Sequence, residues 1–187
     1  MVPTMERLHK FISSKGSVER RGTYTELVAN LLGETVGFLA SDGVRVKVNY
    51  YRLEEIDGRV ALRVVSKTRN VSREVLDEST PEGSAILLRT LKGRDEHCAD
   101  TSTSQNGGVE VARERDYSCF VTATVQSAGT VFGRVSANAD AVDGVPPHGM
   151  AYLKVVGAIL AVAEAHLGEA ASRAVGDTSA LTVSGGA

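Results

Sequence analysis

The chain has 187 residues, of which 42% are hydrophobic, and this is enough for one domain around one core. Its 21 basic and 23 acidic residues give a formal net charge of −2, so overall charge attracts neither nucleic acid nor an anionic membrane, and neither is expected as a partner. No signal peptide opens the chain and no apolar run is judged long enough to span a bilayer, which predicts a cytoplasmic protein.

Residues 24–40 predict an amphipathic helix, because their apolar side chains recur at helical spacing and Thr23 is a suitable N-cap. Residues 44–50 then alternate apolar and polar side chains, which is the period of a half-buried strand. A second alternating run covers residues 60–65, and an Asp-Gly pair between the two runs favours a tight turn. Together the runs predict an antiparallel hairpin.

Thr80 followed by Pro81 predicts the N-cap and first position of a second helix, which ends near Gly93. The apolar positions expected to cover a sheet face are Ala85, Ile86, Leu88 and Leu91. Runs rich in valine, threonine and aromatic residues at 117–126 and 130–138 then predict two strands. The Ser-Ala-Gly sequence between them predicts a second hairpin.

A long closing helix is predicted for residues 150–167, where apolar side chains again recur at helical spacing. The residues after it are small and polar without a period, which is typical of a mobile tail. The chain therefore divides into an N-terminal segment (1–22), a domain (23–168) and a C-terminal tail (169–187). The order of the elements predicts an α+β fold with one largely antiparallel sheet.

Four short motifs follow one another along this layout. They are a Pro-Glu-Gly-Ser-Ala helix start, Cys98-Ala99-Asp100, Tyr117-Ser118-Cys119-Phe120-Val121, and Gly129 followed by Phe132-Gly133-Arg134-Val135-Ser136. In this order they resemble the GAF domain family, over roughly residues 24–167. The resemblance implies a central antiparallel sheet, with the terminal helices on one face and a loop-roofed pocket on the other.

GAF domains commonly sense small molecules, so the resemblance implies a small-molecule-binding regulatory module without catalysis of its own. The ligand-binding residues that it implies are Cys98, Asp100, Tyr117 and Cys119. Neither a cofactor nor a metal site is indicated, because the four histidines are scattered along the chain. The polar segment 100–116 is longer than loops of compact domains usually are, and two readings stay open: a lid over the pocket or a disordered surface excursion.

The two cysteines give an alternative reading, because GAF-like enzymes that reduce free methionine sulfoxide attack it with a thiolate. Enzymes of that subgroup carry three cysteines around the pocket, whereas this chain has only Cys98 and Cys119. The two-residue period places Cys119 among apolar side chains, which predicts a buried and inert thiol. Cys98 is expected to contact solvent or the pocket, where neighbouring carboxylates disfavour its thiolate.

The predicted terminal helices carry more apolar side chains than one sheet face needs. These are Leu27, Leu31, Val156, Ile159, Leu160 and Val162. We therefore predict a homodimer that buries the surplus across a twofold axis, as the GAF resemblance also implies. A ligand-free dimerisation scaffold is the third reading of the function.

Overall fold

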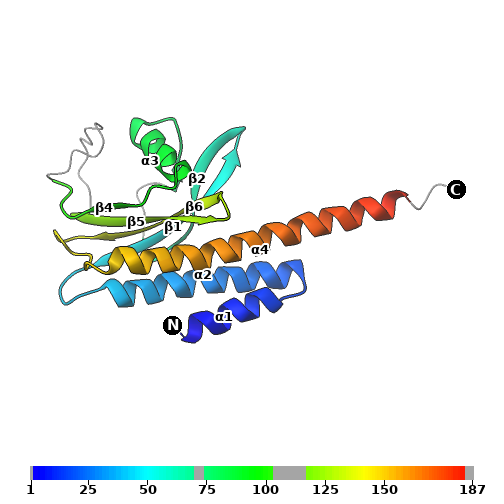
Figure 1. Ribbon diagram of the computed structural model, residues 1–187, viewed down its shortest axis with the longest axis horizontal. Coiled ribbons are helices and arrows are strands. Elements are labelled where there is room, and N and C mark those ends of the chain that lie inside the picture. Colours follow the sequence, from blue (N-terminus) through cyan, green and yellow to red (C-terminus); the bar gives the residue numbers. More distant parts are fainter. Residues whose placement is uncertain (1, 70–73, 103–116, 184–187) are drawn as a thin grey trace.

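The structure, a computed structural model, describes residues 2–69, 74–102 and 117–183, with side chains from residue 3 to residue 168. Helices α1, α2 and α4 cover one face of a six-stranded antiparallel sheet, and α3 lies over the other face (Figure 1). We call these the inner and the outer face. The predicted α+β fold with a central antiparallel sheet is confirmed, and the sheet is open.

The sheet joins two hairpins through its central strands, in the order β3-β2-β1-β6-β5-β4. Its strands are β1 (Val46–Ile56), β2 (Arg59–Lys67), β3 (Val75–Leu76), β4 (Glu96–Cys98), β5 (Cys119–Ser127) and β6 (Thr130–Ala139). Both predicted hairpins are confirmed. Asp57 and Gly58 turn the first, Ala128 and Gly129 turn the second, and φ is positive at all of them, as tight hairpin turns require.

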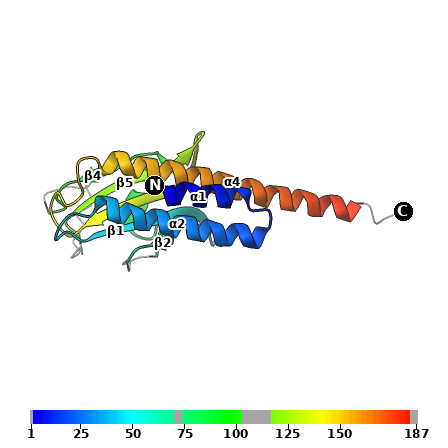
Figure 2. The same cartoon turned by 90° about the horizontal axis from the view of Figure 1, so that it is seen from below.

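Helix α2 (Ser17–Leu39) begins earlier than the sequence predicted, so the prediction of Thr23 as its N-cap is wrong. Thr23 lies inside the helix, where its hydroxyl donates to the carbonyl oxygens of the preceding turn. Residues 1–22 are largely helical as well, because α1 (Val2–Ser13) packs against α2 and α4 and buries Phe11 completely (Figure 2).

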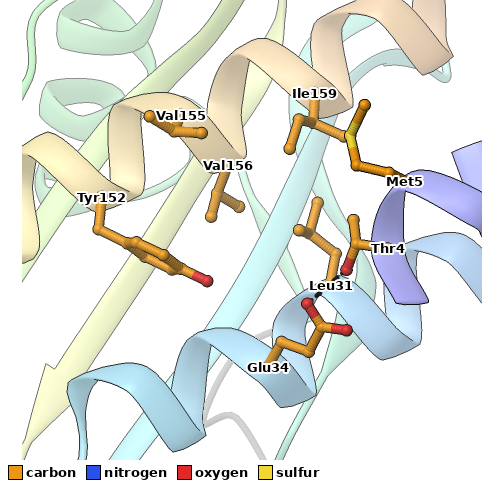
Figure 3. Close-up of a pocket in the computed structure, with 8 residues that line it drawn as sticks. All are labelled: Thr4, Met5, Leu31, Glu34, Tyr152, Val155, Val156 and Ile159. Carbon is orange, nitrogen blue, oxygen red and sulfur yellow. Dashed lines mark hydrogen bonds between the residues drawn. The ribbon is translucent and has the colours of Figure 1, made fainter. Parts of the chain in front are cut away.

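The start of α1 is tied to α2 by a polar contact beside an apolar groove. The Thr4 hydroxyl donates to the Glu34 carboxylate, and Met5 lies next to Ile159 of α4 (Figure 3). This contact joins residues 30 positions apart in the chain and holds α1 against α2. Helix α1 lies on the outside of the helical layer (Figure 1).

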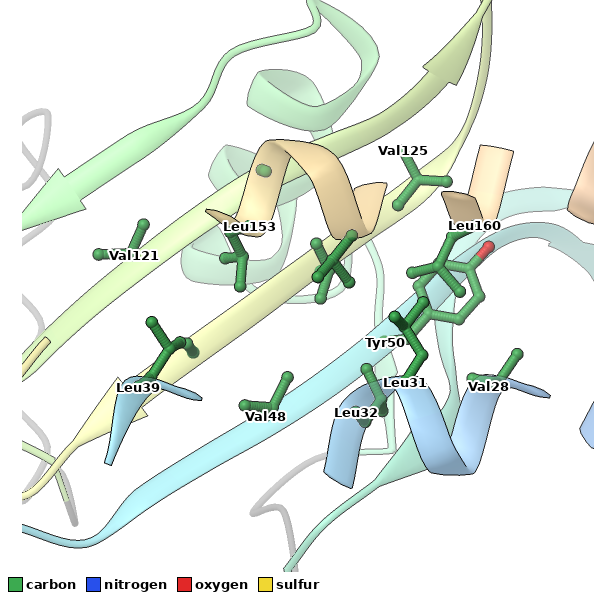
Figure 4. Close-up of a cluster of buried hydrophobic side chains, with 14 of the residues drawn as sticks. Val28, Leu31, Leu32, Leu39, Val48, Tyr50, Val121, Val125, Leu153 and Leu160 are labelled. Carbon is green, nitrogen blue, oxygen red and sulfur yellow. The ribbon is translucent and has the colours of Figure 1, made fainter. Parts of the chain in front are cut away.

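Helix α4 (Gly149–Val183) continues past residue 168, where the sequence predicted an irregular tail. By length and composition its stretch Gly149–Gly168 is able to cross a bilayer, which corrects the earlier statement that no run is long enough. In the fold this stretch contributes to the core, because Leu153 and Leu160 are fully buried between α4 and the sheet (Figure 4).

Helix α3 (Pro81–Leu91) begins as predicted, since the Thr80 hydroxyl accepts a hydrogen bond from the Gly83 amide at 3.1 Å. The prediction of its sheet-facing side is wrong for Leu88 and Leu91, which are 52% and 46% exposed, whereas Ala85 and Ile86 are half-buried. The residues that it buries are Gly83, Leu87 and Thr90. These lie three and four positions apart and therefore share another side of the helix.

Cross-strand rows fill the inner face with apolar side chains from β1, β6 and β5. The rows are Val46, Ala139 and Cys119; Val48, Ala137 and Val121; Tyr50, Val135 and Ala123; and Arg52, Gly133 and Val125. All but Arg52 and Gly133 belong to the hydrophobic core under α2 and α4 (Figure 4). Since strand side chains alternate, the residues between them face outward.

Candidate functional site

The outer face carries three cross-strand rows that are mostly polar. They are Lys47, Asn138, Phe120 and Cys98; Asn49, Ser136, Thr122 and Glu96; and Tyr51, Arg134 and Thr124. Directly opposed residues of antiparallel strands point to the same face, so these side chains form one surface, which we call the polar floor. The floor lies on the side of the sheet that α1, α2 and α4 leave uncovered.

Three polar side chains of the floor are buried. Asn49 and Thr122 are each 3% exposed, and Arg134 is 6% exposed. Within the described part of the chain, Asn49 Oδ1, Thr122 Oγ1 and Arg134 Nη1 have no hydrogen-bond partner. An unmade hydrogen bond of a buried group costs about 1–3 kcal/mol, so such groups are rare in folded proteins. The floor is therefore equipped for hydrogen bonds that the described residues do not make.

Arg134 takes part in one long ionic contact. Its Nη2 lies 3.4 Å from Glu96 Oε2, while Glu96 Oε1 lies 2.8 Å from Arg89 Nη1 on α3. Burial lowers the pKa of Arg134, against the opposing effect of the Glu96 carboxylate. A buried guanidinium that keeps an unpartnered nitrogen is suited to an anionic group or a carbonyl oxygen.

Burial also raises the pKa of Tyr51, the neighbour of Arg134 in its row, to about 12. The phenol therefore stays protonated at neutral pH. It offers the floor a hydroxyl that can donate or accept a hydrogen bond.

A hollow of about 380 Å³ opens at the first row, where β1 begins and β6 ends. Its lining consists of Arg45, Lys47, Arg69, Tyr117, Asn138, Ala139 and Asp140. Three of these are basic, and Arg45 Nε pairs with the one acid, Asp140, at 2.5 Å. The hollow is large enough for a small molecule, and its described lining favours a negatively charged one.

The two cysteines are not brought together by the fold. Cys98 belongs to the floor beside Phe120, and at 7% exposure it is buried, which excludes solvent, one of its two expected surroundings. Cys119 lies on the inner face with no exposed surface, so the prediction that its thiol is buried is confirmed. Burial raises the pKa of the Cys119 thiol, which keeps it protonated and unreactive.

The structure places the other two predicted ligand residues near the same end of the sheet. Tyr117 lines the hollow and meets the Phe120 ring edge-on, with 6.1 Å between ring centroids. The Asp100 carboxylate accepts hydrogen bonds from the Ser102 amide at 2.8 Å and its hydroxyl at 2.7 Å, and these bonds lower the pKa of Asp100. Most of the predicted lid, from residue 103 to 116, lies outside the described residues.

Sequence reasoning missed the central residues of the floor. Asn49, Thr122 and Arg134 alternate with apolar residues, a pattern that predicts a solvent-exposed strand face. The burial of these three side chains depends on what covers the outer face, and no local sequence pattern predicts that cover. The one available signal was an arginine within the apolar run of residues 131–135.

No metal site is visible in the described ranges, where no three His, Cys, Asp or Glu side chains come together.

Solved structures share this arrangement of sheet and helices. The free methionine-R-sulfoxide reductase of Neisseria meningitidis matches with a TM-score of 0.63 and 11% identity, over 89% of this chain and 89% of its own. The GAF domain of the Acinetobacter phosphoenolpyruvate-protein phosphotransferase matches with a TM-score of 0.59 and 13% identity, over 87% and 90%. The corresponding domain from Coxiella burnetii gives 0.59 and 13%, over 93% and 96%. The fold is that of a GAF domain.

The likeness is one of fold, because identities of 11% and 13% leave most side chains different. Neither a family model nor a curated protein matches the sequence. A reductase and GAF domains of phosphotransferases thus match this fold with similar TM-scores. The residues of the polar floor therefore have to carry the argument about function.

Proposed function

We propose that this chain is a small-molecule-binding regulatory GAF module whose ligand sits on the polar floor. The observation that carries the proposal is the set of three buried, unpartnered atoms on Asn49, Thr122 and Arg134, all on one face. A bound molecule would supply their hydrogen bonds and so gain affinity from groups that are already desolvated. Ordered water is the competing occupant, and a ligand search separates the two.

The floor also limits the chemistry of the ligand. Asn49 Oδ1 accepts hydrogen bonds and Arg134 Nη1 donates them, so the ligand needs both a donor and an acceptor. The basic lining of the adjoining hollow favours an anionic group at one end. A small carboxylate or phosphate that also carries a hydroxyl or amino group meets these requirements.

A thiol-dependent reductase is the second candidate, favoured by the fold likeness to free methionine-R-sulfoxide reductases. Its chemistry in this chain would fall to Cys98, the cysteine of the floor. Cys119 lies across the sheet and is poorly placed to resolve an adduct on Cys98. For this reason we favour binding over turnover.

Native mass spectrometry of the protein from its source cells, with a thermal-shift panel of small carboxylates and phosphates, tests the proposal. We expect a retained or stabilising compound whose affinity falls about tenfold in Thr122→Val, the effect of one lost hydrogen bond. Thr35→Val is the matched control, because Thr35 is equally buried but donates to the Leu31 carbonyl at 2.7 Å.

Two other results would replace the proposal. Absence of any bound or stabilising compound would favour the ligand-free scaffold. Thiol-dependent reduction of free methionine sulfoxide that Cys98→Ser abolishes would establish the reductase.

A further inference from the structure

Glu164 of α4 is a buried carboxylate, 7% exposed, that three donors share. Its Oε1 accepts hydrogen bonds from Tyr50 Oη at 2.7 Å and from Arg52 Nε at 2.9 Å, both on β1. The Tyr24 hydroxyl of α2 donates to the same oxygen, and the Arg52 guanidinium lies 5.2 Å from the Tyr24 ring centre. One carboxylate thus joins both long helices to β1, although α4 itself packs over β5 and β6.

The same stretch of β1 serves the polar floor. Asn49 and Tyr51 point to the outer face, whereas Tyr50 and Arg52 point to the inner face and hold Glu164. Consecutive side chains of a strand share one rigid backbone. Any displacement of residues 49–52 at the floor is therefore transmitted to the Glu164 contacts.

The strand pairing is irregular at two places near this stretch, although β1 itself pairs with β6 in regular register. The register of β1 with β2 shifts between Tyr50 and Tyr51, and the register of β5 with β6 shifts beside Gly133. Gly133 lies opposite Arg52 and so close to β1 that a Cβ there would be 2.0 Å from the Tyr51 carbonyl oxygen. Register shifts of this kind interrupt the regular ladder and bend the strand locally, which permits small displacements.

We infer that residues 49–52 of β1 couple the polar floor to the packing of α4 against α2, with Glu164 as the positioning residue on the helix side. Separating Arg52 from Glu164 would leave the buried carboxylate without its charged partner, while the half-buried Arg52 would keep Glu54 at 3.7 Å. The carboxylate and its helix are therefore expected to follow the strand when it moves. This gives the proposed ligand site a route to the terminal helices. The coupling is a property of the protein itself and is tested without a ligand.

Hydrogen exchange of the full-length chain, followed by mass spectrometry, tests the coupling. Asn49→Ala alters β1 from the outer face only. We expect it to speed amide exchange about tenfold in residues 160–167 of α4 and 20–28 of α2, and to leave α3 unchanged. In a Glu164→Leu background the same substitution should change exchange there by less than about twofold, since coupled residues are non-additive.

A control variant and a substitute variant complete this test. Thr122→Ala is the matched control, because Thr122 is as buried as Asn49 and lies on β5, which supplies none of the hydrogen bonds to Glu164 among the described residues. If Glu164→Leu fails to fold, Tyr50→Phe removes one β1 donor and should lower the Asn49→Ala effect about threefold. Equal effects of Thr122→Ala and Asn49→Ala on α4, a full effect of Asn49→Ala in either background, or a uniform speed-up that includes α3 would each overturn the inference.

Discussion

Cys98 and Cys119 point to opposite faces of the sheet, because Cys98 pairs with Phe120, the residue next to Cys119. A disulfide requires two Cβ atoms about 3.5–4.5 Å apart and directed toward each other. Because the sheet lies between the two thiols, their Cβ atoms are not directed toward each other while the sheet is intact. This relationship supports the proposed binding module over a reductase that exchanges disulfides.

The first prediction is that mild oxidation of the folded protein forms no intramolecular disulfide. Intact-mass measurement should show two free thiols under native conditions and a bridge only after unfolding. Cys119→Ala should lower the free energy of unfolding by about 1 kcal/mol, because it empties a fully buried site of one atom. Rapid formation of a disulfide in the folded protein would contradict the predicted geometry.

The second prediction concerns the stability of the ligand-free protein. Thr122→Val replaces a buried, unpartnered hydroxyl by a methyl group of similar size, and should raise the free energy of unfolding by about 1 kcal/mol. Thr35→Val deletes a made hydrogen bond and should lower it by about 1 kcal/mol. Urea unfolding measures both. A gain in stability with a loss of binding is the signature of a site residue, whereas destabilisation by Thr122→Val would indicate an ordinary core threonine.

The third prediction is a loss of stability at high pH. Burial, and then nearby negative charge, raises the pKa of Tyr24 and Tyr50 above the ordinary value of 10.0. Between the unfolded and the higher folded pKa, the native state keeps protons that the unfolded chain has released. The stabilisation is therefore complete below about pH 10 and is lost above it, by about 1.4 kcal/mol per pH unit for each tyrosine.

Urea unfolding at several pH values above about 9 measures that slope. Tyr50→Phe is the control, because it removes one of the phenols whose pKa burial raises, a set that also includes Tyr51 and Tyr152. It should lower the slope by about 1.4 kcal/mol per pH unit. An unchanged slope in this variant would show that Tyr50 is not the group that titrates.

The sequence predicted what is local. The hairpin turns at Asp57-Gly58 and Ala128-Gly129 were recognisable because their chemistry and the alternation beside them lie within a few residues. The start of α2 was not, because Gly22 interrupts its first turns and polar residues surround that glycine. Part of the stability of this segment comes from packing on α1, where the Phe11 and Tyr24 rings lie 5.9 Å apart. Such support from outside the helix leaves no periodic signal.

The polar floor could not be predicted from the sequence, because it also depends on contacts between distant parts of the chain. Asn49 meets Ser136, and through it Thr122, by the pairing of β1 with β6, two strands about 80 residues apart in the chain. Nothing near either strand specifies that register. The cysteines were nearer to being predictable, since the two-residue period correctly placed Cys119 in the core, but the cover over Cys98 was invisible.

The homodimer expected from the terminal helices stays a prediction, and the structure changes the residues that test it. Leu31 and Val156 are 2% and 1% exposed, so they belong to the core of one chain. Among the described residues, the large apolar side chains left exposed on α1 and α4 are Met5, Ile12, Val155 and Val162, at 44–52%. Each helix contributes two residues seven positions apart, which lie on one side of it and favour pairing with another helix.

The fourth prediction is that Val155→Asp with Val162→Asp gives folded monomers, while the unmodified protein sediments as a dimer at tens of micromolar, on the order of concentrations where weak dimers form. Each aspartate would place an unpaired charge in the apolar contact. Leu31→Lys is the contrasting variant, because a charge in the core should unfold the chain by both circular dichroism and sedimentation. A dimer that survives both aspartates would place the interface elsewhere, and a monomeric unmodified protein would mean that α1 already covers the apolar surplus of α2 and α4.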